Sequence, residues 1–228
     1  MIGDPVALTI RRHIERAPKS LVAAFVGAQT SFIADAQNGG GVLDHRIKPL
    51  DPGHSFVGTA ITASGGPRDN LAAMAMLDHV EAGDVLVIAT AADTSGAVIG
   101  DHYATVAKQL GVVGIVTDGL VRDAEGIIRL GPPTFARGLS PNSGFRNGPG
   151  AVNLPVSIGG VAVEPGDIVV GDRDGVIVVP RAEAAAIAGQ LAEVKRLEAE
   201  TEAKVKAGAV RRLWDPAKFE ARGVRDLD

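Results

Sequence analysis

Short apolar, β-branched runs alternate with helical patterns through the middle of the chain, and this alternation constrains the fold more than any other feature. The runs predict strands at residues 56–63, 84–89, 112–117 and 133–136. Apolar residues spaced three and four apart predict helices at 71–80, 103–110 and 123–130. The resulting β-α-β-α-β-α-β order is typical of α/β proteins, in which helices connect neighbouring parallel strands.

Residues 156–180 have a different pattern, in which short β runs are separated by turn sequences. The turns are Gly159-Gly160, Pro165-Gly166-Asp167 and Asp174-Gly175. The segment Asp172 to Gly175 resembles the start of a calcium loop, but it lacks the distal glutamate and predicts a hairpin turn within a strand region at 168–180. We therefore expect an antiparallel portion beside the α/β part.

Residues 181–207 are rich in alanine and glutamate and predict one long helix that a small domain cannot bury fully. Glu198 falls on the apolar stripe of this helix, which consists of Ile187, Leu191, Val194, Thr201 and Val205. Either Leu197 replaces Glu198 on the apolar stripe and the carboxylate is solvated, or Glu198 has a special role there. We expect a single domain at 1–180, followed by a C-terminal helix and tail at 181–228 that pack on a neighbouring subunit.

Composition excludes several classes of protein and site. The 228 residues are 46% hydrophobic with a net charge of −4, and no lysine or arginine run would neutralise nucleic-acid phosphates. Cysteine is absent, so a bound metal must be held by oxygen or imidazole ligands, and no histidine spacing indicates a zinc site. No stretch of about 18 apolar residues predicts a membrane span, so we expect a cytoplasmic protein without nucleic-acid or membrane partners.

The stretch from Gly100 to Asp123 is the most informative for chemistry. Gly100-Asp101 precedes a helix whose first free amides would belong to His102 and Tyr103, and such amides attract carboxylates. Arg122 and Asp123 follow the next strand, beyond the sheet edge where α/β proteins commonly bind ligands. Two carboxylates and a guanidinium suit Mg²⁺ or Mn²⁺ with a planar anion. In the alternative interpretation, both aspartates cap helices and Arg122 forms a surface ion pair.

The sequence resembles the RraA-like family, which includes the 4-hydroxy-4-methyl-2-oxoglutarate/4-carboxy-4-hydroxy-2-oxoadipate aldolases. Aldolase members have an aspartate, twenty intervening residues and then Arg-Asp, which Asp101, residues 102–121 and Arg122-Asp123 match. The resemblance covers most of residues 56–180 and implies helices around a mixed β core, similar to the swivelling β/β/α fold. It is carried by the segments 69–72, 83–87, 100–101, 118–119, 122–123, 135–138, 155–160, 165–167 and 174–176.

The resemblance also implies a metal site shared between subunits. Asp123 would bind the metal directly, whereas Asp101 and a glutamate from the neighbouring subunit's C-terminal helix would bind it through water. Glu198 is the best match for that glutamate and Glu200 is its rival.

A substrate site is implied beside the metal. The backbone amides of His102 and Tyr103, next to Gly100, would hold the pyruvate-like half of the substrate together with Arg122, and Asn70 would lie near the pocket. His102-Tyr103 replaces the aliphatic pair usual in the family, which bears on substrate choice.

These inferences predict a metal-dependent lyase that cleaves 4-hydroxy-2-oxo dicarboxylic acids to pyruvate and decarboxylates oxaloacetate through a shared enolate. A small 2-oxo acid would be its ligand, and a homotrimer or homohexamer its assembly. The alternative is an RraA-like regulator that binds and inhibits a ribonuclease without catalysis. We favour the enzyme because a regulator does not need Asp101, Arg122 and Asp123 together.

Overall fold

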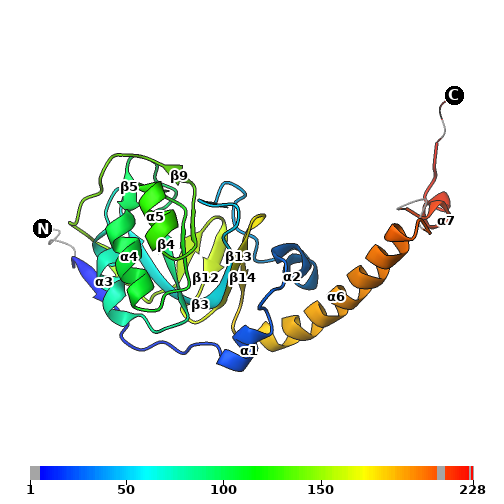
Figure 1. Ribbon diagram of the computed structural model, residues 1–228, viewed down its shortest axis with the longest axis horizontal. Coiled ribbons are helices and arrows are strands. Elements are labelled where there is room, and N and C mark those ends of the chain that lie inside the picture. The colour runs from blue at the N-terminus through cyan, green and yellow to red at the C-terminus, as the bar shows by residue number, and fades with distance from the viewer. Residues whose placement is uncertain (1–5, 210–213, 226, 228) are drawn as a thin grey trace, which may run out of the picture. The chain divides into compact units, whose positions relative to one another are not determined.

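We describe the protein from a computed structural model, in which residues 6–209, 214–225 and 227 are described. Two compact units are present, Met1–Leu191 and Ala192–Asp228. The first contains the sheets and most of the helices (Figure 1). No helix in the described part of the chain combines the length and apolarity needed to cross a membrane.

Four parallel strands form the centre of the first unit and confirm the predicted alternation. They lie side by side in chain order, as β3 (Phe56–Gly65), β4 (Asp84–Ala89), β6 (Gly114–Thr117) and β8 (Thr134–Ala136). The connecting helices lie on one side of this sheet in Figure 1 and are α3 (Leu71–Met76), α4 (Asp101–Gln109) and α5 (Ala124–Leu130). The last turn of the predicted helix at 71–80 is the 3-10 helix η1 (Leu77–His79).

Antiparallel strands complete a nine-stranded sheet. One edge of β3 pairs with two strands, β13 (Ile168–Asp172) along its first half and β10 (Gly150–Val152) at its end. The outer strands are β1 (Leu8–Ile10) beside β10, β14 (Gly175–Val179) beside β13, and β2 (Lys48–Pro49) beside β8. A separate hairpin joins β11 (Val156–Ile158) to β12 (Val161–Val163). The turns predicted at Gly159-Gly160 and Asp174-Gly175 connect these hairpins.

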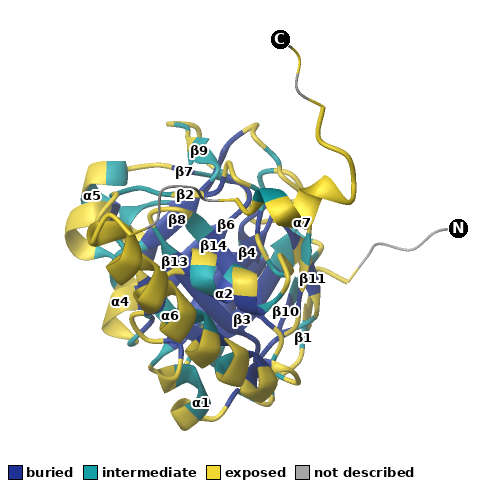
Figure 2. Ribbon diagram, turned by 90° about the vertical axis from the view of Figure 1, so that its right-hand side faces the viewer, coloured by how far each residue is buried: buried dark blue, intermediate teal, exposed yellow. Residues whose placement is uncertain are grey.

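Both faces of the central sheet are buried (Figure 2). Along β4, Leu86 and Ile88 belong to the cluster beneath α3 to α5, whereas Val85 and Val87 belong to the cluster on the opposite face. This arrangement explains why the strand appears in the sequence as a continuous apolar run. Each such side chain contributes roughly 1.5–3 kcal/mol when fully buried.

A second, three-stranded parallel sheet lies where the central strands end. Its strands are β5 (Ala97–Ile99), β7 (Leu120–Val121) and β9 (Gly138–Leu139), and they follow β4, β6 and β8 in the chain. The strands are two or three residues long, so their sequences carry no periodicity that could have predicted them. This small sheet aligns three consecutive loops and thereby places the candidate site.

The remaining helices are α1 (Lys19–Ala23), α2 (Thr30–Ala36), α6 (Ala184–Lys206) and α7 (Pro216–Glu220). Helix α6 confirms the long helix predicted at 181–207. Within the first unit it buries Ala184, Ile187 and Leu191. The part of α6 in the second unit carries Glu198, whose side chain is exposed, as is Leu197.

Candidate active site

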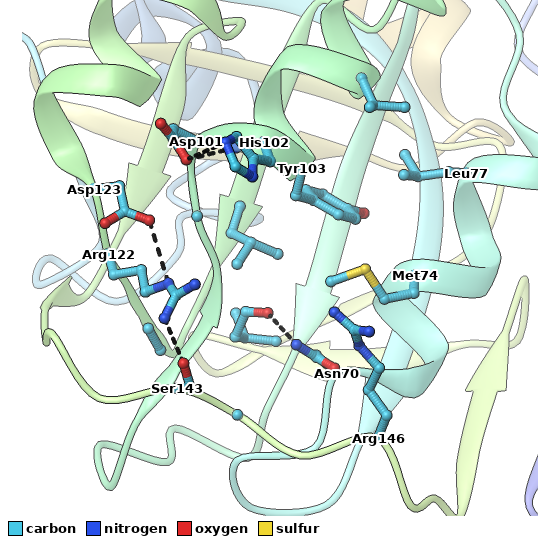
Figure 3. A pocket seen from close by; sticks show the side chains of 16 residues that line it. Asn70, Met74, Leu77, Asp101, His102, Tyr103, Arg122, Asp123, Ser143 and Arg146 are labelled. Atoms are coloured by element: carbon cyan, nitrogen blue, oxygen red, sulfur yellow. Dashed lines mark hydrogen bonds and ion pairs between the residues drawn. The ribbon is translucent and has the colours of Figure 1, made fainter.

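A pocket of about 340 Å³ opens beside the N-terminus of α4 (Figure 3). Its walls come from α3, β5, α4, the residues after β7 and the loop between β9 and β10. Every site residue that the sequence suggested within one subunit lines this pocket, namely Asn70, Gly100, Asp101, His102, Tyr103, Arg122 and Asp123. Glu198 lies in the second unit, and its approach to the pocket of another subunit stays a prediction.

Asp101 begins α4, and Gly100 is the N-cap residue of that helix. The Oδ1 atom of Asp101 accepts a hydrogen bond of 2.7 Å from the backbone amide of His102. A substrate carboxylate that binds this amide must therefore displace the Asp101 contact. The backbone amide of Tyr103, in the same first turn, has no hydrogen-bond partner within the helix and can donate to a bound anion.

Asp123 precedes α5 but does not act as an ordinary helix cap. Its backbone is left-handed, with φ of 57°, and its side chain makes no capping hydrogen bond. This conformation costs on the order of 1 kcal/mol or more for a residue with a Cβ, although aspartate tolerates it better than most. The carboxylate lies beside Arg122 instead, with Oδ2 3.2 Å from Nε. In this conformation the Asp123 carboxylate lines the pocket instead of capping α5.

Two glycines allow the carboxylates to lie against the backbone. A Cβ atom at Gly100 would lie 2.6 Å from Asp123 Oδ2, and one at Gly126 would lie 2.7 Å from Asp101 Oδ2. Both distances are too short for real contacts, so only glycine permits these positions of the two carboxylates.

The carboxylates of Asp101 and Asp123 are oxygen donors of the kind that a hard divalent cation prefers. Within the described residues, no group of three or more histidine, aspartate or glutamate side chains is arranged so that it could hold a metal ion. The described part of the pocket therefore offers two carboxylates, and a cation bound there would need further donors to complete its coordination.

Arg122 carries the positive charge on this side of the pocket. Its backbone amide donates to the carbonyl of Ile99 at the end of β5 (3.1 Å), and its Nη1 donates to the hydroxyl of Ser143. Its side chain is 44% exposed and carries N–H groups beyond the two that contact Asp123 and Ser143. These groups can bind a carboxylate or an enolate oxygen.

Three further pocket residues differ in what their side chains offer. Asn70 is buried, and its Nδ2 donates to the carbonyl of Val98 (3.2 Å), while its Oδ1 has no partner among the described residues. The hydroxyl of Tyr103 donates to the carbonyl of Ala73 (2.8 Å), and burial raises the pKa of this phenol. Tyr103 therefore offers the pocket its ring and backbone rather than its hydroxyl. The His102 side chain is fully exposed.

Sequence reasoning missed Ser143 and Arg146, which also line the pocket. They belong to a loop rich in glycine, proline and asparagine that has no regular spacing. Asp69 holds this loop in place, because its Oδ2 accepts hydrogen bonds from the amides of Asn147 (2.6 Å) and Gly148 (2.8 Å). No local pattern in the sequence indicates these contacts, which join residues about eighty positions apart.

Comparison with known proteins agrees with the resemblance. Residues 30–178 match the family model RraA-like: Aldolase/RraA. A protein of Halalkalibacterium halodurans named "Putative 4-hydroxy-4-methyl-2-oxoglutarate aldolase" is 36% identical over 194 residues, which are 85% of this chain and 91% of the relative. A structure of an uncharacterized protein from Pseudomonas syringae pv. tomato has a TM-score of 0.77 at 26% identity, covering 86% of this chain and 97% of that one.

The structure of RraAS2 from Streptomyces coelicolor is also similar. It is named as an unusual member of the RNase ES inhibitor RraA protein family. Its TM-score is 0.74 at 30% identity, and the match covers 83% of this chain and 100% of that one. Since the family model matches more than half of the sequence and the surrounding fold agrees, the chain belongs to the RraA-like family.

Proposed function

We propose that the protein is a divalent-metal-dependent carbon–carbon lyase. It would cleave 4-hydroxy-2-oxo dicarboxylic acids, such as 4-hydroxy-4-methyl-2-oxoglutarate, to pyruvate, and it would decarboxylate oxaloacetate. The observation that carries this proposal is the convergence of Asp101, Arg122 and Asp123 on one pocket. The name of the Halalkalibacterium halodurans relative supports the substrate class.

Asp123 and Asp101 are the residues that would hold Mg²⁺ or Mn²⁺, completed by Glu198 of a neighbouring subunit in a homotrimer or homohexamer. Glu198 is favoured over Glu200 because Arg196 forms an ion pair with Glu200, whereas Glu198 takes part in no ion pair within the described part of the chain. When bound, the cation would withdraw electrons from the 2-oxo acid and so favour cleavage of its C3–C4 bond.

Arg122 would bind the substrate carboxylate and neutralise the charge that develops on the 2-oxo oxygen. In a 4-hydroxy acid, the 4-hydroxyl would lose its proton to solvent as the C3–C4 bond breaks. C4 then becomes a carbonyl, and the electron pair of the broken bond stays on the pyruvate half as an enolate. Loss of CO₂ from oxaloacetate leaves the same enolate, and protonation at C3 then gives pyruvate. The first turn of α4 would orient the carboxylate throughout, through the Tyr103 amide.

Steady-state assays with 4-hydroxy-2-oxo acids and oxaloacetate, with Mg²⁺ or with a chelator, test this proposal. We expect pyruvate to form from both substrate types in the presence of the metal and to cease with the chelator. If no pyruvate forms from any of these substrates at saturating Mg²⁺, the proposed activity is wrong. Inhibition of a ribonuclease by the same preparation would then favour the regulator.

A further inference from the structure

Ser143 lies on the rim of the pocket, where its hydroxyl accepts a hydrogen bond from Nη1 of Arg122 (Figure 3). Within the described part of the chain, the other polar side-chain contact of this guanidinium is the one between Nε and Asp123 Oδ2. Nearly half of the Arg122 side chain is exposed, so packing alone does not immobilise it. The two polar contacts together set the plane of the guanidinium.

Both partners of this hydrogen bond are anchored to the same short strand. Arg122 is joined to the end of β5 through the Ile99 carbonyl, and Ser143 forms a β-bridge with Ala97 at the start of β5. The amide of Ala97 also donates to the carbonyl of Asn142 (2.9 Å). The donor and the acceptor are 21 residues apart in sequence, yet backbone contacts to Ala97 and Ile99, the two end residues of β5, fix their separation.

The main chain around Ser143 is held from a second direction. Arg68 donates from Nη2 to the Ser143 carbonyl (2.9 Å), and its guanidinium lies 4.5 Å from the centre of the Phe145 ring. A Cβ atom at Gly144 would lie 2.6 Å from the Arg68 carbonyl oxygen, so the loop can approach this closely only with glycine. The Ser143 hydroxyl is therefore presented to Arg122 from a fixed backbone.

We propose that Ser143 is a positioning residue that orients Arg122 toward the carboxylate or enolate of the substrate, an inference that rests on the proposed function. Planar, paired hydrogen bonds from a guanidinium require the correct plane as well as the correct charge. A long side chain that is already ordered loses less conformational entropy when the substrate binds. Ser143 supplies this order without touching the reacting bond.

The variants Ser143→Ala, Ser143→Thr and Arg122→Lys, together with the double variant S143A/R122K, test this role through oxaloacetate decarboxylation. We expect Ser143→Ala to lower kcat/KM on the order of tenfold, since small losses of alignment are costly in catalysis. Ser143→Thr keeps the hydroxyl and should recover most of that loss. If Ser143 acts through Arg122, the Ser143→Ala change should cost less than about twofold in the Arg122→Lys background.

A second measurement is independent of turnover. The ¹⁵N order parameter of the Arg122 Nε–H group, assigned by its loss in Arg122→Lys, should fall in Ser143→Ala and recover in Ser143→Thr. The wild-type protein could prove inactive while Arg122 still loses order in Ser143→Ala. That result would refute the proposed function but not the positioning role of Ser143. An unchanged order parameter, or equal losses of activity in both Arg122 backgrounds, would overturn the role of Ser143.

Discussion

A Cβ atom at residue 126 would lie 2.6 Å from the Cβ of Asp101, so Gly126 of α5 lets the first residue of α4 lie directly against it. Gly126→Ala should displace the Asp101 carboxylate and lower metal-dependent activity by at least about tenfold, with the fold retained. Alanine normally stabilises a helix interior by roughly 0.5–1 kcal/mol relative to glycine, so a drop in activity without that gain indicates the clash. Activity assays and thermal unfolding measure both effects.

Gly189 provides the matched control for this substitution. It lies within α6, and among the described residues no atom beyond its chain neighbours and the adjacent helix backbone is within 4 Å of a Cβ placed on it. Gly189→Ala should leave activity unchanged and raise stability by up to about 1 kcal/mol. Equal activities of the two alanine variants would show that Asp101 does not depend on Gly126.

Asp123 combines a left-handed backbone with a carboxylate directed at the pocket. Asp123→Asn should keep the fold and the stability, because asparagine also tolerates this conformation, yet it should weaken Mn²⁺ binding by about 10-fold or more. Asp123→Ala should lose the metal as well and be less stable by roughly 1–2 kcal/mol. Calorimetric titration with Mn²⁺ and chemical denaturation distinguish the two effects. Wild-type Mn²⁺ affinity in Asp123→Asn would place the metal elsewhere.

The Glu198 prediction can be tested with mixed oligomers. Asp123→Ala and Glu198→Ala homo-oligomers should each be nearly inactive. A boundary between unlike subunits, however, can pair an intact Asp123 with an intact Glu198. Co-refolding the two variants should recover a minority of the wild-type activity, in proportion to the mixed species. Glu200→Ala serves as the control and should be close to wild type. No recovery despite verified subunit exchange would remove Glu198 from the neighbouring site.

Asp69 should control the loop that carries Ser143 and Arg146. Its carboxylate accepts hydrogen bonds from the amides of Leu71, Asn147 and Gly148, and an asparagine would present an N–H₂ group in place of one oxygen. Asp69→Asn should therefore destabilise the protein by roughly 1–3 kcal/mol. Amide hydrogen exchange at Asn147 and Gly148 should become faster while exchange in β4 stays slow. Unchanged protection at these amides would mean that other contacts hold the loop.

The sequence could predict those helices and strands in which apolar residues recur with the period of a helix or a buried strand. Strand β4 is buried on both faces and α4 on one face, so each leaves a pattern of apolar residues. Helix boundaries are predicted less well, as Asp123 illustrates. The apolar pattern predicts that the helix begins at this residue, but its backbone is left-handed and α5 begins at Ala124. The strands β5, β7 and β9 are too short for any period.

The candidate site divides in the same way. Asp101, Arg122 and Asp123 could be found because they stand at a fixed spacing beside predicted element ends, where an α/β fold gathers ligand-binding groups. Ser143 and Arg146 could not, because contacts with Asp69 and Arg68, more than seventy residues earlier in the chain, bring their loop to the pocket. Only tertiary structure brings these segments together.

The sheet formed by β5, β7 and β9 also limits how such a pocket can diversify. Because these strands hydrogen-bond to one another, a change in the length of any one loop would shift the register of its neighbours and move Gly100, Arg122 and Ser143 together. Substrate preference in this scaffold should therefore change through side-chain exchange at positions such as 102 and 146, with loop lengths held constant. Libraries built on this chain would best randomise those positions and leave insertions to the exposed turn at Arg173 and Asp174 between β13 and β14.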